Sequence, residues 1–463
     1  MILNDTVVAL ATAPGSGAIA IIRLSGPKAI AICNSLFVSV VPGKLIKDQA
    51  THSIHLGHIK DGDKTLDEVL VSVFKNPNSY TGEDVIEISC HGSPFIQQEI
   101  IQLMLRNGCR MATPGEFTLR AFLNGKLDLS QAEAVADLIA SDNEASHKIA
   151  MQQMRGGFSS EIAKLREELL NFASLIELEL DFAEEDVEFA DRTQFKALVD
   201  RITEVLKRLI DSFAVGNVIK NGIPVAIVGE PNVGKSTLLN ALLNEDRAIV
   251  SDIAGTTRDT IEDEIAIGGI GFRFIDTAGI RETKDLVESI GIQKTFEKID
   301  QSQVVIYLFD TSSAVAELER IQIEIEKIKN KHPLKPLIVL ANKVDKLSQE
   351  DKKLLENTLD NVLLLSAKSG QGVDELTAKL LDLINTGALR NDETIVTNTR
   401  HYDALLKAFE EIQKVKYGLE SGLSGDLMAI DIRQALYHFG EITGEITNDD
   451  LLGNIFANFC IGK

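Results

Sequence analysis

The sequence predicts a multi-domain protein of α/β and all-α parts, in which a doubly wound, mostly parallel sheet is inserted into a helical domain. Short apolar runs alternate with helical segments over residues 224–385, as they do in a parallel sheet covered by helices. Helical periodicity precedes this region over about 121–215 and resumes after about 386. One discontinuous helical domain accounts for both flanks, because insertions are tolerated where the termini of a domain lie close together.

The first 120 residues are expected to form a separate α+β domain. Their apolar runs have the composition or the period-two alternation of strands, and Gly and Pro separate them. The strands expected here are 18–24, 69–74 and 85–89. In the helical region, apolar residues three and four apart predict helices over 161–180 and 199–213. The Gly and Pro of 221–224 break the second helix.

Four short apolar runs in the inserted region have the length and composition of buried strands. They lie at 225–228, 272–275, 304–309 and 337–340. The sequence therefore predicts four ranges, which are an N-terminal α+β domain at 1–120, the first helical part at 121–215, the α/β domain at 216–385 and the second helical part at 386–463.

The 463 residues carry a formal net charge of -22, from 47 Lys and Arg against 69 Asp and Glu. Such acidity disfavours extensive, sequence-independent binding to the phosphate backbone of nucleic acids, but it is compatible with a local basic patch. No apolar run approaches the roughly 20 residues of a membrane helix, and the N-terminus lacks the regions of a signal peptide. We expect a cytoplasmic protein with no membrane partner.

Residues 229–236, GEPNVGKS, match the phosphate-binding loop pattern G-x-x-x-x-G-K-[ST] between an expected strand and an expected helix. Glycines let the backbone wrap phosphates, while its N–H groups and the helix N-terminus supply positive potential. Lys235 is expected to reach the β- and γ-phosphates, and the Ser236 hydroxyl to ligate Mg²⁺. The nucleotide contacts expected in this loop are Asn232, Val233, Gly234, Lys235, Ser236 and Thr237.

Three further motifs follow in the order typical of GTPases, and together they predict GTP binding and hydrolysis. The motif DTAG at 276–279 places a carboxylate near Mg²⁺ and a glycine N–H near the γ-phosphate. In NKVD at 342–345, Asp345 can accept hydrogen bonds from N1–H and N2–H₂ of guanine, a donor pair that adenine lacks. SAK at 366–368 resembles the guanine-backing motif. The contacts expected here are Asp276, Thr277, Ala278, Gly279, Asn342, Lys343, Asp345, Ser366, Ala367 and Lys368.

A polar segment at 251–259 resembles the first switch loop of GTPases, and the alternative is an ordinary polar surface loop. Thr257 would complete the Mg²⁺ shell with Ser236. Small signalling GTPases carry a water-orienting Gln directly after the glycine of DTAG. Here that position is Ile280, so another group must position the attacking water. The nucleotide contacts expected in the segment are Ser251, Asp252, Ile253, Ala254, Gly255, Thr256 and Thr257.

Further motifs occur along essentially the whole chain and in all the expected domains. They are APGSG at 13–17, IRLSG at 22–26, YTGED at 80–84, Glu87, His91 and Gly92, TPGEFT at 113–118, NGKLDL at 124–129, GTTRD at 255–259 and FCIGK at 459–463. Together with the GTPase motifs, they resemble those of one family, the tRNA-modification GTPases called MnmE or TrmE.

The resemblance implies an N-terminal folate-binding and dimerising domain, a discontinuous helical domain and an inserted P-loop GTPase domain. It also implies a homodimer that joins the FAD protein MnmG in a heterotetramer. Together they would add an aminomethyl or carboxymethylaminomethyl group to C5 of the wobble uridine of certain tRNAs. The carbon would come from methylene-tetrahydrofolate, and GTP hydrolysis would gate the conformational cycle.

The resemblance further implies how hydrolysis is completed. In this family two GTPase domains pair across a K⁺ ion, which offsets developing charge as an arginine finger would. Lys235 and Thr257 match catalytic positions, and Glu288 matches the residue that orients the attacking water. Without the family, Glu288 is one of several acids on a surface helix. The positions that match K⁺ ligands are Asn232, Ser251, Ile253 and Thr256.

A folate site needs a carboxylate for the donor–acceptor edge of the pterin and cations for the glutamate tail. Arg23, Glu87, Lys126 and Lys463 match the family's folate-contacting positions; taken alone, each better fits a surface or ion-paired residue. The ligand would be 5,10-methylene- or 5-formyl-tetrahydrofolate. The four cysteines match no zinc or disulfide spacing. Cys460 is a candidate reactive thiol because it lies in a shared motif, and the alternative is an ordinary small cysteine.

The main alternative is a GTPase that binds ribosomal RNA and assists ribosome assembly. The chain lacks an obvious basic RNA-binding domain, and its flanking motifs resemble the modification family instead. The acidic balance leaves contact with tRNA to a local basic patch or to the partner protein.

Overall fold

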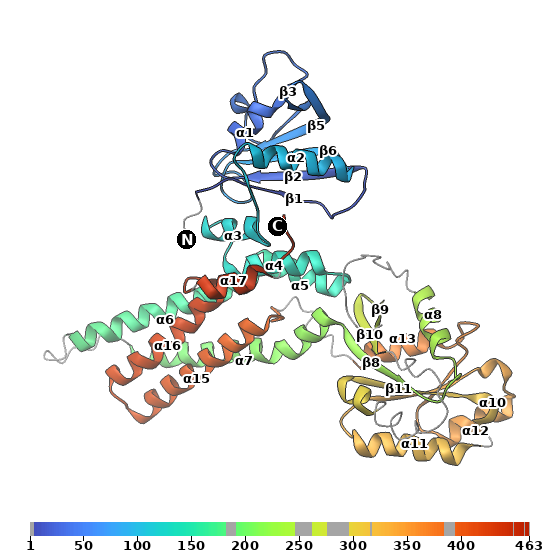
Figure 1. The fold of residues 1–463 in the computed structure, drawn as a ribbon. Coiled ribbons are helices and arrows are strands. Elements are labelled where there is room, and N and C mark those ends of the chain that lie inside the picture. The colour runs from blue at the N-terminus through green and yellow to red at the C-terminus, as the bar shows by residue number, and fades with distance from the viewer. Residues whose placement is uncertain are drawn as a thin grey trace. The chain divides into compact units, whose positions relative to one another are not determined.

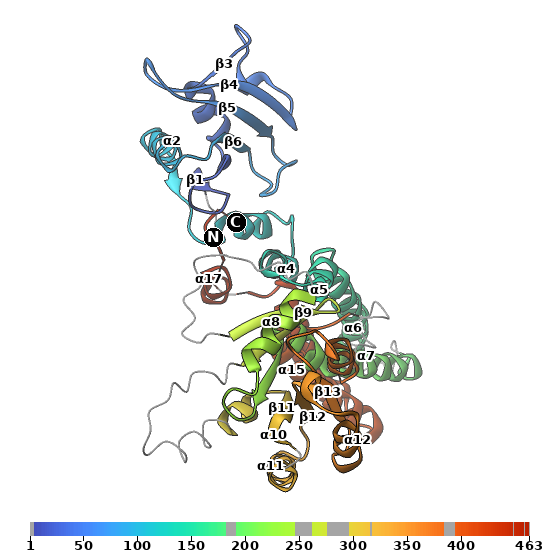
Figure 2. The same cartoon turned by 90° about the vertical axis from the view of Figure 1, so that its right-hand side faces the viewer.

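A computed structural model gives the structure of the chain and describes residues 4–181, 191–245, 262–275, 296–314, 317–383, 394–447, 449–457 and 459–462. The chain forms two units. The first comprises Met1–Ile139, Ala150–Lys207 and Asp403–Lys463, and the second comprises Ala140–Ile149 and Arg208–Tyr402. Most of the second unit is thus an insertion into the sequence of the first. Figures 1 and 2 trace both units by colour along the chain.

The first unit contains a seven-stranded sheet in the order β3-β4-β5-β6-β2-β1-β7. Its strands are β1 (Val7–Leu10), β2 (Ile19–Ser25), β3 (Phe37–Ser39), β4 (Ser53–Asp61), β5 (Lys64–Phe74), β6 (Val85–His91) and β7 (Arg110–Met111). Neighbouring strands are antiparallel except β1 and β7, which run parallel. The three strands expected from the sequence correspond to β2, β5 and β6, and the predicted α+β class of this region is confirmed.

Helices α1 (Ala29–Leu36) and α2 (Pro94–Arg106) pack on one face of this sheet, and the short helix η1 (Ile46–Asp48) lies beside them. Side chains of both helices share one apolar core with alternate residues of the strands. Ile22 and Ile88, for example, are fully buried in it. Burial of a single face accounts for the period-two pattern of these strands in the sequence.

The helices of the first unit come from two distant parts of the sequence, which confirms the predicted discontinuous helical domain. In chain order they are α3 (Glu116–Leu123), α4 (Leu129–Ala140), α6 (Gly157–Asp181), α16 (Gly425–Thr443) and α17 (Asp449–Ala457). α6 packs along α16, as Figure 1 shows, and α17 packs on α3. Residues of both units occur in α5 (Glu144–Met154), α7 (Arg192–Asn221) and α15 (Thr399–Ser421), and the last residue of α4, Ala140, belongs to the second unit.

The second unit contains a six-stranded sheet in the order β13-β12-β11-β8-β10-β9. Its strands are β8 (Ile223–Val228), β9 (Glu262–Ile267), β10 (Ile270–Ile275), β11 (Val304–Asp310), β12 (Leu337–Asn342) and β13 (Val362–Leu365). Neighbours are parallel except β9 and β10, which form an antiparallel hairpin. The prediction of a doubly wound, mostly parallel sheet is confirmed, and the four expected strands correspond to β8, β10, β11 and β12.

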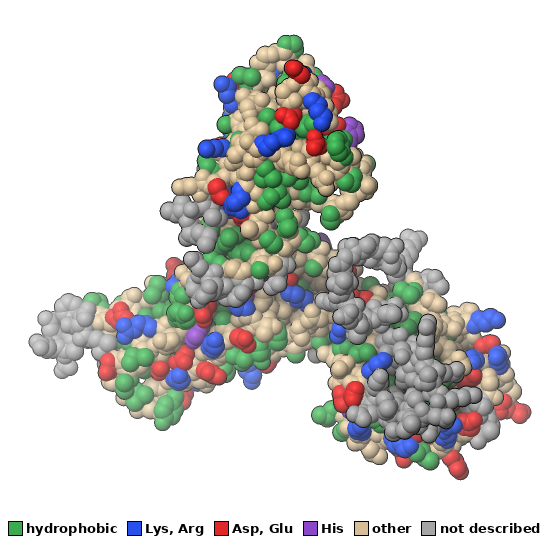
Figure 3. Space-filling view, viewed as in Figure 1, with side chains coloured by type: hydrophobic (Ala, Val, Ile, Leu, Met, Phe, Trp, Pro, Cys, Tyr) green, Lys and Arg blue, Asp and Glu red, His purple; other side chains and the backbone are tan. Residues whose placement is uncertain are grey.

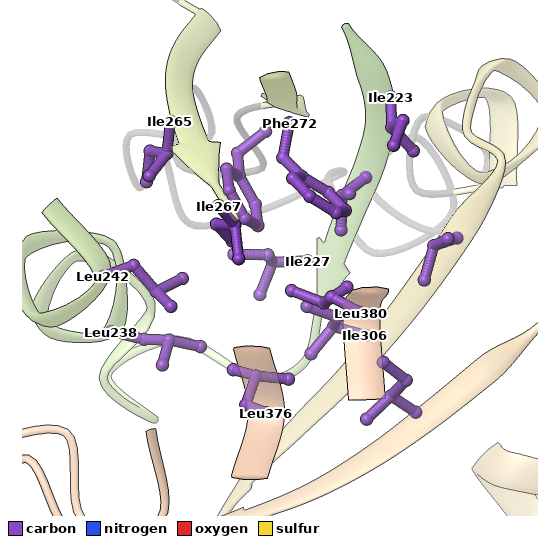
Figure 4. Packing of buried hydrophobic residues seen from close by; sticks show 14 of the residues in the cluster. Ile223, Ile227, Leu238, Leu242, Ile265, Ile267, Phe272, Ile306, Leu376 and Leu380 are labelled. Atoms are coloured by element: carbon purple, nitrogen blue, oxygen red, sulfur yellow. The ribbon is translucent and has the colours of Figure 1, made fainter. Parts of the chain in front are cut away.

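Helices cover both faces of the six-stranded sheet. On one face, α8 (Lys235–Glu245) and α13 (Val373–Asp382) direct apolar side chains toward the strands, as Figure 4 shows for Leu238 and Leu376. On the other face lie α11 (Leu318–Lys331) and α12 (Gln349–Thr358). Burial on both sides accounts for the continuous apolar runs of the central strands in the sequence.

The carboxyl edge of this sheet carries three of the motifs that the sequence assigns to the nucleotide site. The short helices α10 (Thr311–Ala314) and η3 (Val344–Lys346) directly follow β11 and β12. In a parallel sheet the loops after successive strands meet at one edge, which is where such folds bind ligands. The GEPNVGKS, NKVD and SAK motifs follow β8, β12 and β13, so the topology brings all three to this edge.

A buried ionic network in the first unit explains two of the shared motifs. The Arg120 guanidinium on α3 is 1% exposed and lies 2.6 Å from Asp5, 3.1 Å from Glu83 and 2.8 Å from Glu116. Arg110 places a second cation 2.6 Å from Glu116. Glu83 belongs to YTGED and Glu116 to TPGEFT. These motifs therefore supply paired charges to the interior, where an unpaired charge would be strongly destabilising.

Glu116 makes this network sensitive to pH. Burial raises the pKa of its carboxyl, but hydrogen bonds from Arg110, Arg120 and the Thr113 N–H outweigh burial and lower the pKa to about 2. We predict that Glu116→Gln lowers the Tm of the first unit by about 5 °C at pH 7, because Arg120 keeps a buried charge with one partner fewer. A carboxyl whose pKa is lower in the folded state than in the unfolded state stabilises the fold at pH values above the unfolded pKa. This contribution is lost as the pH falls towards the folded pKa. The difference in Tm between wild type and Glu116→Gln should therefore shrink as pH falls from about 4.5 towards 2.

Calorimetry between pH 7 and pH 3 measures both effects. Glu99→Gln is a matched control, because Glu99 and Lys64 form an ion pair whose side chains are 28% and 60% exposed. Its loss should leave the Tm unchanged. A difference between wild type and Glu116→Gln that stays constant over this pH range would contradict the predicted linkage.

Candidate functional site

The phosphate-binding loop runs from the end of β8 to the start of α8, and two glycines determine its path. Gly229 has a φ of 150° and Gly234 a φ of 103°. A Cβ atom on Gly229 would overlap the Leu308 carbonyl oxygen, and one on Gly234 would overlap the side-chain amide of Asn342. Both positions therefore require glycine, and the loop lies directly against the ends of β11 and β12.

The middle of this loop is held in a shape that suits phosphate. Asn232 has a left-handed backbone with a φ of 64°, which Asn tolerates better than most residues. The side chain of Val233 is buried in the apolar core that it shares with α8. Lys235, Ser236 and Thr237 form the first turn of α8. The N–H groups and the dipole of a helix N-terminus favour an anion at this place.

Asn342, the last residue of β12, joins three loops through its side-chain amide. It is 2% exposed. Its Nδ2 donates to the Val233 carbonyl at 2.8 Å, and its Oδ1 accepts from the Ala367 N–H at 3.0 Å. Leaving either end of a buried amide unpaired costs about 1–3 kcal/mol, so these bonds fix the amide's orientation. The structure thereby brings the GEPNVGKS, NKVD and SAK motifs into contact.

Asp345 lies in η3 beside the SAK segment. Its Oδ1 accepts from the Ser366 hydroxyl at 2.7 Å, and Ser366 itself is fully buried. This hydrogen bond, aided by the charges of neighbouring lysines that include Lys368, lowers the pKa of Asp345 below its usual value. The carboxylate is therefore ionised and oriented, which is the form that can accept two hydrogen bonds from guanine.

Several predicted site residues lie outside the part of the chain that the structure describes. β9 begins at Glu262 and β10 ends at Ile275, so the described chain stops directly before the DTAG motif. The predicted residues outside it are Ser251, Asp252, Ile253, Ala254, Gly255, Thr256, Thr257, Asp276, Thr277, Ala278, Gly279, Ile280, Glu288 and Lys463.

A second group of predicted residues meets in the first unit. Arg23 on β2 and Glu87 on β6 are cross-strand partners. Nε and Nη2 of Arg23 both lie 2.8 Å from Oε1 of Glu87, and the two side chains are 19% and 22% exposed. The guanidinium also faces the rings of Tyr80 and Phe117, at 5.7 and 5.6 Å from their centroids. A carboxylate, a cation and two aromatic rings are thus gathered at one place.

The C-terminal segment reaches the same place. Nη1 of Arg23 donates to the Gly462 carbonyl at 3.3 Å, and the Gly115 N–H donates to the Cys460 carbonyl at 3.4 Å. Lys126 is exposed, and its Nζ donates at 3.0 Å to a carbonyl of the loop before YTGED. Residues from both ends of the chain therefore build this part of the molecule.

The four cysteines differ in exposure. Cys460 is exposed, while Cys33, Cys90 and Cys109 are buried. Burial raises the pKa of Cys33 to about 12, and it raises the pKa of Cys90 and Cys109 to about 11. Thiols of this kind stay protonated at neutral pH and are poor nucleophiles. Cys460 is the one cysteine whose side chain solvent reaches freely.

Three residues of these sites were not predicted from the sequence. Tyr80 and Phe117 lie within YTGED and TPGEFT, so membership of a shared motif was the available signal. Asp310 pairs with Lys343 at 2.6 Å. The sequence feature that could have indicated Asp310 is a carboxylate at the end of β11, the strand next to β8. In all three cases the contact joins separate segments, which spacing along the chain does not show.

Two protein-family models match the chain. The one described as "GTP-binding protein TrmE N-terminus" matches residues 6–126, and the one described as "MnmE helical domain" matches residues 129–460. The chain belongs to the MnmE family. It is 75% identical over 467 residues to the tRNA modification GTPase MnmE of Flavobacterium johnsoniae and 73% identical over 463 residues to that of Flavobacterium psychrophilum. Both alignments cover 100% of each chain.

Membership of the MnmE family favours the tRNA-modification interpretation over the ribosome-assembly alternative. Among solved structures, the chain is similar to Era in complex with MgGDPNP and part of 16S ribosomal RNA, with 29% identity and a TM-score of 0.27. That alignment covers 41% of this chain and 66% of the Era chain. Among the helices that the structure describes, none is long and apolar enough to cross a membrane.

Replacing Asp345 by Asn tests the guanine contact. We predict that Asp345→Asn weakens GTP binding by about 100-fold, because an amide presents an N–H where the carboxylate accepts from a guanine donor. Xanthosine triphosphate carries a carbonyl in place of the guanine amino group, so it should bind the variant better than GTP does. Titrations with fluorescent nucleotides measure both affinities.

The control for this substitution is Asp360→Asn, at an exposed position before β13. It should bind both nucleotides as the wild type does. Wild-type affinity for GTP in Asp345→Asn would contradict the assigned contact.

Proposed function

We propose that this chain is the GTP-hydrolysing component of an enzyme that modifies C5 of the wobble uridine in certain tRNAs. The proposal is carried by the full-length agreement with relatives named tRNA modification GTPase MnmE. The contact of phosphate loop and guanine loop through Asn342 supports it. We also propose the domain ranges 1–120, 121–215, 216–385 and 386–463, and a cytoplasmic location.

In the proposed hydrolysis, the phosphates of GTP lie along the loop after β8, and Lys235 neutralises charge on the β- and γ-phosphates. Ser236 lies in the first turn of α8 beside this loop, which suits a hydroxyl ligand of Mg²⁺. Thr257 is proposed as a second ligand. Mg²⁺ supplies Lewis-acid stabilisation of phosphate charge when bound. Glu288 is proposed to orient the attacking water, because Ile280 has no polar side-chain group for that task.

We propose that K⁺ is held by Asn232, Ser251, Ile253 and Thr256. The fit is supported by Asn232, whose side chain carries an amide oxygen and whose left-handed backbone lies in the phosphate loop. When bound, K⁺ offsets the charge that develops between the β- and γ-phosphates. Equal GTPase rates in Na⁺ and in K⁺ would reject this role.

A tetrahydrofolate derivative, 5,10-methylene- or 5-formyl-tetrahydrofolate, is proposed to bind at Arg23 and Glu87. The carboxylate can pair with the donor–acceptor edge of a pterin, and the neighbouring rings of Tyr80 and Phe117 offer apolar contact. Lys126 and Lys463 are proposed to contact the glutamate tail. The folate supplies the carbon that is transferred. Cys460 is proposed as a reactive thiol of this site.

An uncovered apolar face of the seven-stranded sheet supports a homodimer. Val38, Ile54, Leu56 and Leu70, on the adjacent strands β3, β4 and β5, are 48%, 66%, 43% and 44% exposed. Leu56 and Leu70 are direct cross-strand partners. Exposed apolar patches of this kind mark interaction surfaces, and we propose that a second copy covers this one. A chain that sediments as a monomer would reject the dimer.

We propose that the dimer forms a heterotetramer with MnmG, which carries FAD, and that the complex binds tRNA. On the face seen in Figure 3, Lys and Arg side chains of the described residues are interspersed with Asp and Glu. With a net charge of -22, the chain carries more acidic than basic side chains. We therefore propose that MnmG supplies part of the positive charge that binds the phosphates of tRNA.

The proposed function predicts a specific defect in tRNA. Wobble uridines from a strain that lacks this protein should lose their C5 side chains, and the wild-type chain or Asp360→Asn should restore them. Asp345→Asn should not restore them, because it impairs GTP binding. Nucleoside analysis by mass spectrometry measures the outcome. Unchanged nucleosides together with altered ribosomal subunit profiles would support the ribosome-assembly alternative instead.

Glu87 provides a test of the folate site that does not depend on GTP. We predict that Glu87→Gln weakens 5-formyl-tetrahydrofolate binding about tenfold or more, because a charge-assisted acceptor becomes a neutral amide. Calorimetry with the purified chain measures the affinity. Glu68→Gln is the matched control, since Glu68 is a 57% exposed carboxylate on the neighbouring strand β5. Unchanged binding in Glu87→Gln would remove Glu87 from the site.

A further inference from the structure

Asp310, at the end of β11, holds a residue of the NKVD motif. Its Oδ2 accepts from Nζ of Lys343 at 2.6 Å, and its Oδ1 accepts from the Ser312 N–H at 2.9 Å. Burial raises the pKa of Asp310, but the hydrogen bonds from Lys343 and Ser312 outweigh burial and lower it below its usual value. The carboxylate is therefore ionised at neutral pH and is fixed through both oxygens.

The Lys343 ammonium also donates to the phosphate loop. Its second acceptor is the Asn232 carbonyl oxygen, at 3.1 Å. Lys343 therefore bridges three segments, namely the end of β11, the start of η3 and the loop between β8 and α8. Lys343 and Asn232 are two of the four non-glycine residues with positive φ in the described part of the chain. Unfavourable backbone conformations persist where surrounding contacts fix them, and they cluster at functional sites.

The bond to Asp310 accounts for the fixed position of this lysine. A lysine ammonium is a strongly hydrated point charge on a flexible stem, so one contact with a neutral carbonyl restrains it little. A short charge-assisted bond to a carboxylate restrains it far more. Because Asp310 is itself held by the Ser312 backbone, the main chain after β11 sets the position of the ammonium.

We propose that Asp310 is a positioning residue of the nucleotide site. It holds Lys343 against the Asn232 carbonyl and so keeps the guanine loop and the phosphate loop in the arrangement that binds GTP or GDP. This role rests on the proposed GTPase function, and none of the sequence motifs assigns it. The competing interpretation is a partly exposed ion pair without influence on the nucleotide, since many such pairs contribute little.

Asp310→Asn tests the role with minimal change of shape. The amide keeps an acceptor for the Ser312 N–H and removes the charge. We expect GDP to dissociate about tenfold faster, with an equal loss of affinity, while the Tm of the nucleotide-free chain stays unchanged. Stopped-flow release of fluorescent GDP and calorimetry measure these quantities. Asp310→Glu, which keeps the charge, should recover part of the affinity.

The matched control is Glu324→Gln, which breaks the 2.7 Å pair between Glu324 and Lys327 on α11 in the same unit. It should leave GDP release unchanged. A double-mutant cycle then separates positioning from general destabilisation. In a Lys343→Met background, Asp310→Asn should change GDP release by less than about twofold, because the group that it positions is gone.

Two results would overturn the role of Asp310 and leave the proposed GTPase function intact. One is wild-type GDP release in Asp310→Asn, and the other is a tenfold effect that persists in the Lys343→Met background. If the wild-type chain bound no GDP, the proposed GTPase function would fail as well. The two failures are therefore distinguished by the behaviour of the wild type.

Discussion

The nucleotide site depends on the satisfaction of one buried side-chain amide. Asn342 donates to the phosphate loop at Val233 and accepts from the SAK segment at Ala367. Gly234 lies so close to the same amide that a side chain there would overlap it. These contacts link the phosphate loop to the guanine loops, and a shift of one against another would break a buried hydrogen bond or create a clash.

The six-stranded sheet of the second unit supports this arrangement of loops. Its central strands are buried on both faces, and helices from both sides fill the space with apolar side chains. The residues that matter for chemistry follow the carboxyl ends of these strands, so a packed core carries loops whose own regular structure is short. Two carboxylates at this edge, Asp310 at the end of β11 and Asp345 after β12, are each oriented by a hydrogen-bond donor from a neighbouring segment.

The first unit contains charged side chains in the interior of its α+β domain. Arg120 and Arg110 share the carboxylates of Asp5 and Glu116, so the buried charges of Arg120 and Glu116 are compensated by a network rather than by one isolated pair. The Arg23 site is completed by a carbonyl 439 residues further along the chain, at Gly462. The interrupted helical domain makes this possible, since it returns the end of the chain to the unit in which the chain began.

Local patterns were sufficient to predict the fold class and much of the nucleotide site. Apolar runs of strand length, helical periodicity and the fixed spacing of GEPNVGKS, NKVD and SAK are properties of short segments, so the sequence shows them directly. The same is true of Arg23 and Glu87, which lie in motifs shared with the MnmE family. The roles of Glu83 and Glu116 as ion-pair partners of the buried Arg120 were not predicted, although both lie in such motifs.

Local sequence patterns predict the fold class, seven of the strands, the loop that is expected to bind phosphate and the carboxylate that is expected to accept from guanine. The folded chain is needed to see that Tyr80 and Phe117 flank Arg23 and that Lys343 bonds to both Asp310 and Asn232, because these contacts join atoms from separate strands and loops. Their distances are set by strand register and by packing across the sheet, and neither quantity is encoded in the spacing of residues along the chain.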